Sequence, residues 1–217
     1  MFLRLHNYWR SSASHRVRIA LALKNLPYEY VAVPIKPGAD AQHDSGYLKR
    51  NPEGRVPTLE ADGHVLTQSM AILEWLDEVV PNPPLLPADP WDRAHVRGLT
   101  QLIVADIQPL QNLSAHRQLR ALGINDAGIT SWIHHWINRG LSAFEQQLVR
   151  GRPGPFCHGT APTLADICLI PQCHAARRFG VSLAPFSLVS QIEQHCLSLE
   201  CFQTAAPENQ PDAEAAT

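Results

Sequence analysis

A cluster of prolines constrains the fold of this 217-residue chain more than any other feature of its sequence. The prolines of the cluster are Pro81, Pro83, Pro84 and Pro87. Proline has no amide donor and a fixed φ, so the segment 81–87 continues neither a helix nor a central strand. We interpret it as a linker. It divides the chain into a predicted first domain over residues 1–82 and a predicted second domain over residues 88–206.

The residues before the linker alternate between the two-residue period of strands and the 3.6-residue period of helices. Strands are predicted at 2–8, 28–33, 57–61 and 64–66, and helices at 11–24, weakly at 39–50, and from Ser69 onward. The pair Asp62-Gly63 between the last two strands is typical of a two-residue hairpin turn, in which glycine accepts a positive φ. The first domain is therefore predicted to be mixed α/β.

The residues after the linker show helical periodicity. Long helices are predicted at 90–118, 126–149 and 163–178. Thr163 and Asp166 match a capping box at the start of the third of these helices, which is a structural role. Residues 207–217 have no apolar face to bury, so we expect a flexible tail there. The second domain is thus predicted to be all-helical.

Composition and charge disfavour several classes of protein. The formal net charge is −2 and no run of Lys or Arg is present, so nucleic acid is not an expected partner. No apolar stretch approaches the roughly 20 residues that span a bilayer, and the first residues do not resemble a signal peptide. We therefore expect a cytoplasmic protein without a membrane partner, whose five cysteines are free thiols. Adjacent His134 and His135 point about 100° apart on a helix, so no metal is expected there.

The candidate reactive site lies where the first predicted strand meets the first predicted helix, at Ser11 and Ser12. A helix N-terminus presents unpaired amides and a positive dipole end, and it stabilises an anion by about 0.3–1 kcal/mol. Serine hydroxyls at this point add donors. The alternative is that Ser11 or Ser12 is only a helix cap. Two more backbone features suited to a peptide-like anion occur nearby in sequence, at Val56-Pro57 and Gln68-Ser69.

These motifs together resemble the zeta class of glutathione transferases, whose best-known members are maleylacetoacetate and maleylpyruvate isomerases. The similarity runs from Tyr8 to about Asp212. Its strongest segments are 10–21, Asn51-Pro52, 56–59, Gln68-Ser69 and 107–113. The resemblance implies a thioredoxin-like α/β N-terminal domain followed by an all-α C-terminal domain, glutathione as the cofactor, and a homodimer.

The resemblance also implies how individual residues hold glutathione. Ser11 is expected to hydrogen-bond its sulfur, with Ser12 and the amides near Ala13 assisting. Lowering a thiol pKa by two units requires about 2.7 kcal/mol of preferential stabilisation of the anion. Val56 is expected to pair its backbone with the cysteinyl part of glutathione, next to a cis bond to Pro57.

The other end of glutathione is assigned in the same way. Gln68 and Ser69 are expected to receive the γ-glutamyl carboxylate at a helix N-terminus. Gln42, Gln108 and Asn112 are further expected contacts.

The implied reaction is the cis–trans isomerisation of an enone dicarboxylate. The sulfur adds to a double-bonded carbon, the bond rotates and the sulfur leaves, so no metal or redox cofactor is needed. The two carboxylates require cations, for which Arg10 and Arg178 are the candidates. The alternative for Arg178 is a surface charge beside Arg177.

Departures from the family pattern bear on the substrate. Ala13 stands where some members have cysteine, which disfavours chemistry that needs a second thiol. Gln108 replaces a histidine and Leu113-Ser114 replaces arginines found in some maleylpyruvate isomerases, which favours maleylacetoacetate over maleylpyruvate. Two alternatives remain open: a glutathione-conjugating or peroxidase-type transferase, and a glutathione-binding protein without catalysis.

Overall fold

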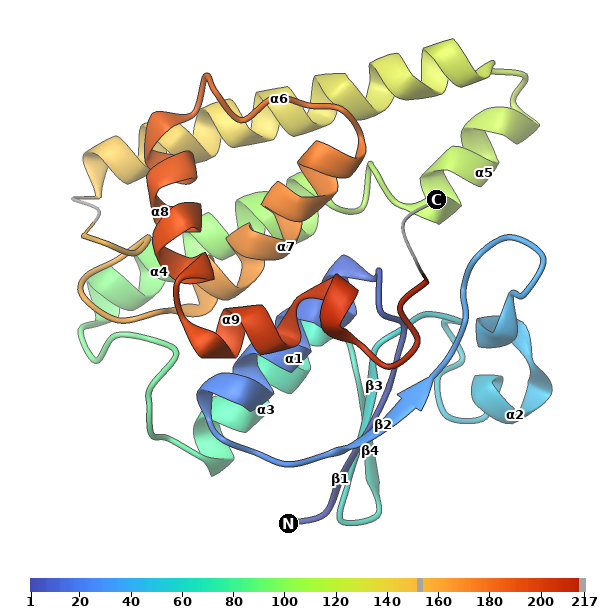
Figure 1. Cartoon of the computed structure of the whole chain (residues 1–217), viewed down its shortest axis with the longest axis horizontal. Coiled ribbons are helices and arrows are strands. Elements are labelled where there is room, and N and C mark those ends of the chain that lie inside the picture. The colour runs from blue at the N-terminus through green and yellow to red at the C-terminus, as the bar shows by residue number, and fades with distance from the viewer. Residues whose placement is uncertain (152–153, 215–217) are drawn as a thin grey trace. The chain divides into compact units, whose positions relative to one another are not determined.

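The computed structural model describes residues 1–151 and 154–214, which form two compact units (Figure 1). One unit combines Met1–Pro84 with the described part of Ser198–Thr217, and the other is Leu85–Leu197. The division after Pro84 falls inside the predicted linker 81–87. Residues 198–206 differ from the expectation, because they pack with the first unit instead of the helical one.

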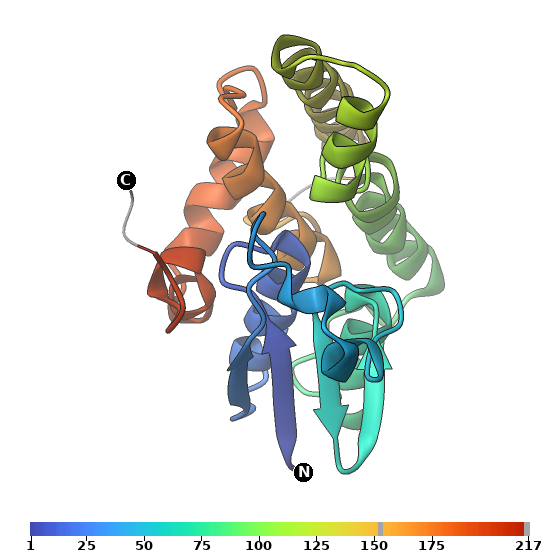
Figure 2. The ribbon, with the colours of Figure 1, turned by 90° about the vertical axis from the view of Figure 1, so that its right-hand side faces the viewer.

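The first unit is built on a four-stranded sheet (Figure 2). Its strands are β1 (Leu3–Asn7), β2 (Glu29–Ala32), β3 (Thr58–Ala61) and β4 (His64–Thr67). Their order is β2-β1-β3-β4, with β2 parallel to β1 and β3 antiparallel to both β1 and β4. The hairpin turn lies at Asp62 and Gly63 as predicted, with φ values of 46° and 87°. The mixed sheet confirms the expected thioredoxin-like α/β domain.

Two helices, α1 (Ser12–Leu23) and α3 (Ser69–Val79), pack side by side on one face of the sheet (Figures 1 and 2). Leu5 and Leu59 of the sheet and Leu21 and Leu73 of these helices are fully buried. Apolar residues at strand and helix spacing therefore account for this core, as the periodicity predicts. The weak helix predicted at 39–50 is instead two short pieces, a 3₁₀ helix at Ala41–His43 and α2 at Ser45–Leu48.

The end of the chain completes the first unit. Helix α9 (Glu200–Ala205) packs against α1, and a 3₁₀ turn follows at Pro207–Asn209. The buried guanidinium of Arg18 donates to the backbone oxygens of Ala205 at 3.1 Å and Trp9 at 2.9 Å. Burial lowers the pKa of Arg18 to about 10, so the group stays charged at neutral pH.

Within the segment 207–217, where a flexible tail is predicted, residues 207–214 make contacts with the first unit. Asp212 accepts hydrogen bonds from the backbone N–H of Trp9 at 3.2 Å and from the hydroxyl of Tyr30. The prediction depends on the lack of an apolar face, whereas polar contacts and a buried Pro207 hold this segment. Residues 215–217 lie outside the described residues.

The second unit is helical, as predicted. Its helices are α4 (Pro90–Gln101), a π-helix at Leu102–Ile107, α5 (Leu113–Ala121), α6 (Asp126–Arg150), α7 (Leu164–Arg178) and α8 (Ser187–Leu197). Ile137, Leu141 and Phe144 of α6 are fully buried at helical spacing, and α7 is buried along most of its length. A helix that is buried on nearly all sides lies at the centre of a bundle, which describes α7 from Leu164 to Ala176.

The single helix predicted at 90–118 is wrong. The chain changes to the π-helix within that range and stops before α5. Pro109 cannot donate an amide to a continuing helix, and the side-chain oxygen of Asn112 accepts from the first amides of α5 at 3.0 and 3.1 Å. Asn112 therefore starts a new helix.

The predicted capping box is present at the start of α7. The Asp166 carboxylate accepts from the backbone N–H groups of Thr163 at 2.8 Å and Cys157 at 2.7 Å. Burial raises the pKa of Asp166. All five cysteines are free thiols as expected; four are buried, and Cys201 is half-buried.

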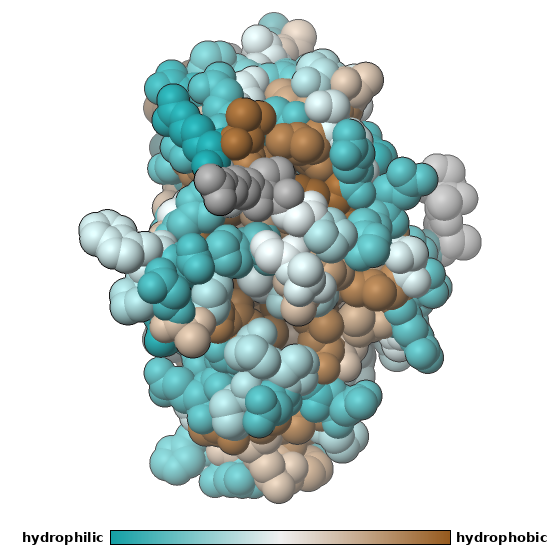
Figure 3. Space-filling view, turned by 90° about the vertical axis from the view of Figure 1, so that its left-hand side faces the viewer, coloured by the Kyte–Doolittle hydropathy of each residue, from teal (hydrophilic) through white to brown (hydrophobic). Residues whose placement is uncertain are grey.

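Hydrophobic surface occurs in separate patches among hydrophilic residues on the face shown in Figure 3. Over the described ranges, no helix has both the length and the apolar character needed to cross a membrane.

Candidate active site

Three segments singled out in the sequence meet at one end of the sheet. His6 near the end of β1 pairs with Thr58 at the start of β3, which pairs with Thr67 at the end of β4. The residues that follow β1, precede β3 and follow β4 therefore share this sheet end. They are the segments around Ser11, around Val56-Pro57 and around Gln68-Ser69.

Ser11 is the N-cap of α1. Its Oγ accepts a hydrogen bond from the backbone N–H of Ser14 at 3.2 Å, so the capping alternative is confirmed. Accepting this bond uses a lone pair and leaves the hydroxyl proton available to donate. The cap and a hydroxyl donor are thus compatible roles for Ser11.

The first turn of α1 offers further donors. The amides of Ser12 and Ala13 have no acceptor within the described part of the chain, as is typical of a helix N-terminus. Arg10 places its guanidinium 5.6 Å from the centre of the Trp9 ring. Among the described residues Arg10 has no carboxylate partner, so its positive charge stands next to the donors of α1.

The peptide bond between Val56 and Pro57 is cis, as expected. The Val56 side chain packs in a small apolar cluster with Tyr8 and Tyr47. Its backbone N–H and C=O lie just before β3 and pair with no other described residue. An extended peptide would find one donor and one acceptor there.

The N-terminus of α3 is held from two sides. Gln68 adopts φ 66° and ψ 116°, and its side-chain amide donates to Glu53 Oε2 at 2.6 Å. Ser69 Oγ accepts from Arg16 Nη1 at 3.3 Å. The side chain of Gln68 is therefore engaged within the protein, which leaves the backbone of this turn for a ligand.

Gln42 has one satisfied and one unsatisfied end. Its Nε2 donates to Asp40 Oδ1 at 3.2 Å, whereas its buried Oε1 has no partner among the described residues. A buried acceptor without a donor costs about 1–3 kcal/mol. The amide N–H of a ligand would remove that cost.

The remaining predicted residues belong to the second unit. The ring of His116, one turn after Asn112, contacts the Phe179 ring at 5.7 Å between centres. The Arg178 guanidinium lies 4.7 Å from the same Phe179 ring. The structure thus brings Asn112 and Arg178 to one region, while the neighbouring Arg177 pairs with Glu193 of α8.

The loop that carries Gln108 is fixed by contacts that sequence analysis missed. Gln111 and Gln172 exchange two buried hydrogen bonds, of 2.9 and 3.0 Å. Trp132 Nε1 donates to the backbone oxygen of Leu110 at 2.8 Å. No local signal identifies such a pair, because the two glutamines are far apart in sequence.

Arg16 and Arg18 were also missed, and here a signal exists. Both are almost fully buried, at 2% and 1% exposure; Arg18 interrupts the apolar run 17–23 of α1, and Arg16 directly precedes this run. A charged residue inside an apolar run marks a buried group that needs hydrogen-bond partners.

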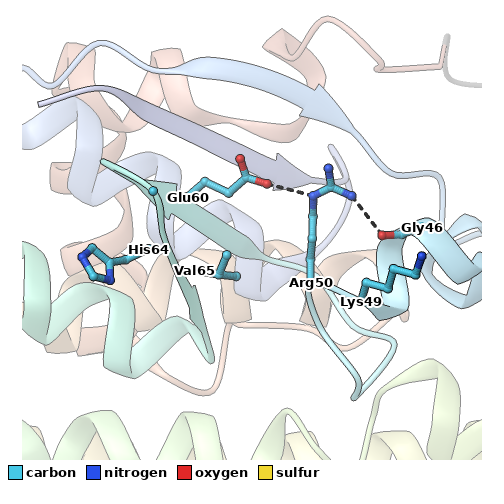
Figure 4. Close-up of a pocket in the computed structure, with 7 residues that line it drawn as sticks. Gly46, Lys49, Arg50, Glu60, His64 and Val65 are labelled. Atoms are coloured by element: carbon cyan, nitrogen blue, oxygen red, sulfur yellow. Dashed lines mark hydrogen bonds and ion pairs between the residues drawn. The ribbon is translucent and has the colours of Figure 1, made fainter.

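A surface pocket lies away from the predicted residues (Figure 4). Arg50 reaches from just after α2 to Glu60 on β3, and donates to Glu60 at 2.8 Å. Glu60 also accepts from Arg4 and His6. Although burial acts to raise the pKa of Glu60, the hydrogen bonds from Arg50 and His6 hold it below its ordinary value. The charges of Arg50 and Glu60 are already paired with each other, so we interpret this contact as structural: it attaches the segment that follows α2 to the sheet.

Comparison with known proteins gives consistent matches. A family model described as the glutathione S-transferase N-terminal domain matches residues 1–78. A maleylpyruvate isomerase of a Ralstonia species is 43% identical over 213 residues, which cover 97% of this chain and all of that protein.

Two solved structures are also similar. One is the holo structure of a bacterial maleylpyruvate isomerase described as a zeta-class glutathione S-transferase, with a TM-score of 0.94, 43% identity, and coverage of 97% of this chain and 100% of that one. The other is a maleylacetoacetate isomerase of Anaeromyxobacter dehalogenans with bound glutathione, with a TM-score of 0.88, 46% identity, and coverage of 98% of both chains.

Proposed function

This chain belongs to the glutathione transferase family, in its zeta class of maleylacetoacetate and maleylpyruvate isomerases, and from that premise we propose that it is a glutathione-dependent cis–trans isomerase of a maleyl keto acid. The observation that carries the proposal is the N-terminus of α1. There the Ser11 hydroxyl and the amides of Ser12 and Ala13 offer donors without an acceptor of their own among the described residues.

When bound, glutathione supplies the nucleophilic sulfur. Ser11 and the first amides of α1 donate to that sulfur and favour its anionic form. The backbone of Val56 and the unsatisfied Oε1 of Gln42 hold the peptide part. The N-terminus of α3, at Ser69, holds the γ-glutamyl carboxylate.

The substrate is an enone with two carboxylates, and Arg10 is proposed to bind one of them. Its guanidinium has no competing carboxylate among the described residues, and Arg10 directly precedes Ser11 in the loop between β1 and α1. Arg178, at the end of α7, is the second proposed cation. Gln108 and Asn112 are further proposed contacts of glutathione. We favour maleylacetoacetate over maleylpyruvate, because Gln108 and Leu113-Ser114 depart from the pattern of some maleylpyruvate isomerases.

The test is an isomerisation assay with both maleyl keto acids, each with and without glutathione. We expect turnover that requires glutathione and is faster with maleylacetoacetate. Turnover that continues unchanged without glutathione would overturn the mechanism, and faster turnover of maleylpyruvate would overturn the substrate preference.

The same assay separates the alternatives. Conjugation of haloacids or reduction of peroxides without isomerisation would indicate a transferase of another activity. Glutathione binding without turnover of any of these compounds would indicate a binding protein.

We also propose that the chain forms a homodimer in the cytoplasm, as its family membership suggests. Light scattering coupled to size-exclusion chromatography should give twice the mass of the 24.1 kDa chain. A monomer mass across the working concentration range would contradict this.

A further inference from the structure

Arg16 connects the two helices whose N-termini form the proposed glutathione site. It lies on α1 with 2% of its surface exposed, and its Nη1 is 3.3 Å from Ser69 Oγ at the start of α3. The two residues are 53 positions apart in sequence, and the helices α1 and α3 pack together. The contact therefore depends on the fold of this unit.

The chemistry of the pair fixes the direction of its hydrogen bond. A guanidinium carries donors only, so Arg16 must donate and Ser69 Oγ must accept. The hydroxyl proton of Ser69 cannot point to Arg16 and remains free to donate to another group. An amide or carboxylate side chain in place of Arg16 would offer an acceptor and could capture that proton.

We propose that Arg16 is a positioning residue that holds the Ser69 hydroxyl as a donor to the α-carboxylate of the γ-glutamyl group. This inference rests on the proposed function, because it assumes that glutathione binds at the α3 N-terminus. A carboxylate bound to Ser69 would lie within roughly 6 Å of Nη1, the sum of two hydrogen-bond lengths. At that distance the buried positive charge adds to the attraction of the helix N-terminus.

The experiment measures glutathione binding by calorimetry in Arg16→Met, Arg16→Lys and Ser69→Ala. Each variant is also titrated with a glutathione analogue whose γ-glutamyl α-carboxylate is replaced by hydrogen. We expect Arg16→Met and Ser69→Ala each to raise the Kd for glutathione by about tenfold or more, the usual effect of losing a hydrogen bond to a charged group. Their Kd values for the analogue should match that of the wild type, and Arg16→Lys should retain part of the affinity.

A double variant tests whether Arg16 acts through Ser69. In the Ser69→Ala background, Arg16→Met should weaken glutathione binding much less than it does in the wild type. The inference would be overturned if the two substitutions raised the Kd for glutathione by fully multiplicative factors. It would also be overturned if Arg16→Met weakened binding of the analogue as much as binding of glutathione. The second result would mean that Arg16 supports only the packing of α1 on α3.

The variants and the wild type distinguish a folding defect, a failure of the proposed function and a failure of the inference about Arg16. If Arg16→Met does not fold, Arg16→Lys and Ser69→Ala still compare the two ligands. If the wild-type protein does not bind glutathione, the proposed function fails. If the wild type binds and Arg16→Met binds equally well, the inference alone fails.

Discussion

The carboxylate of Asp212 accepts a hydrogen bond from the backbone N–H of Trp9 at 3.2 Å, which ties the end of the chain to the loop before Ser11. Asp212→Ala would leave this amide and the Tyr30 hydroxyl without their partner. We expect a loss of about 1–3 kcal/mol in the free energy of unfolding, measured by urea denaturation. The control is Glu214→Gln, which removes only an exposed ion pair with Lys36 and should change stability little. Equal effects of the two variants would contradict the assignment.

Ser11→Ala should raise the thiol pKa of bound glutathione by about one unit or more, since one unit corresponds to about 1.4 kcal/mol of anion stabilisation. The ultraviolet absorbance of the thiolate, followed against pH, measures it. At a pH between the two pKa values, the variant then holds less thiolate than the wild type and turns over more slowly.

A matched variant separates this effect from the loss of the helix cap. Ser11→Ala removes the acceptor of the Ser14 amide and should cost about 1 kcal/mol of stability, whereas Ser11→Gly should cost a few tenths. Both lack the hydroxyl, so both should show the raised thiol pKa. A normal thiol pKa in Ser11→Gly would assign Ser11 to the cap alone.

Arg10→Ala should raise the apparent KM for a maleyl keto acid by about tenfold or more, since an ion-paired hydrogen bond is lost. The KM for a neutral enone should change little, and so should the Kd for glutathione. Arg10→Lys keeps the charge without the planar fork and should fall between the wild type and Arg10→Ala. Equal changes for the dicarboxylate and the neutral enone would remove this role.

Because Gln111 and Gln172 form a buried pair, we expect substitutions at the two positions to have non-additive effects on stability. Gln111→Leu alone leaves the Gln172 amide buried without a partner, and should cost about 1–3 kcal/mol in the free energy of unfolding. The double variant, with leucine at both positions, removes all the unpaired polar atoms and should recover much of that loss. Denaturant unfolding of the single and double variants measures the difference, and simple additivity would contradict the pairing.

Local sequence signals were sufficient for most elements of the fold. The Asp62-Gly63 turn, the helix start at Ser69 and the Thr163–Asp166 capping box each depend on a few neighbouring residues, and the structure has all three. Local signals gave a wrong prediction for the helix at 90–118. The helical periodicity of the sequence continues on both sides of Pro109, whereas the helix itself is interrupted there.

Contacts between residues far apart in sequence could not be predicted from local signals. The bonds of Asp212 to Trp9 and of Arg16 to Ser69 join segments 203 and 53 positions apart. They depend on which elements the fold places side by side, and the polar composition of 207–217 even suggested the opposite. For the candidate site, motifs singled out Ser11, whereas the residues that hold its loop and the α3 turn emerged only from the structure.

Both ends of the chain build the first unit, and this has a consequence for the order of folding during synthesis. The strands and helices up to Pro84 leave the ribosome before α9 and Asp212 are made, so the loop of Trp9 gains these hydrogen bonds only after residue 212 has been synthesised. Domains usually fold in order of synthesis, and here the helical unit has the chance to fold first. In a nascent chain stalled after residue 197, we expect proteolysis to cut the first unit more readily than the second.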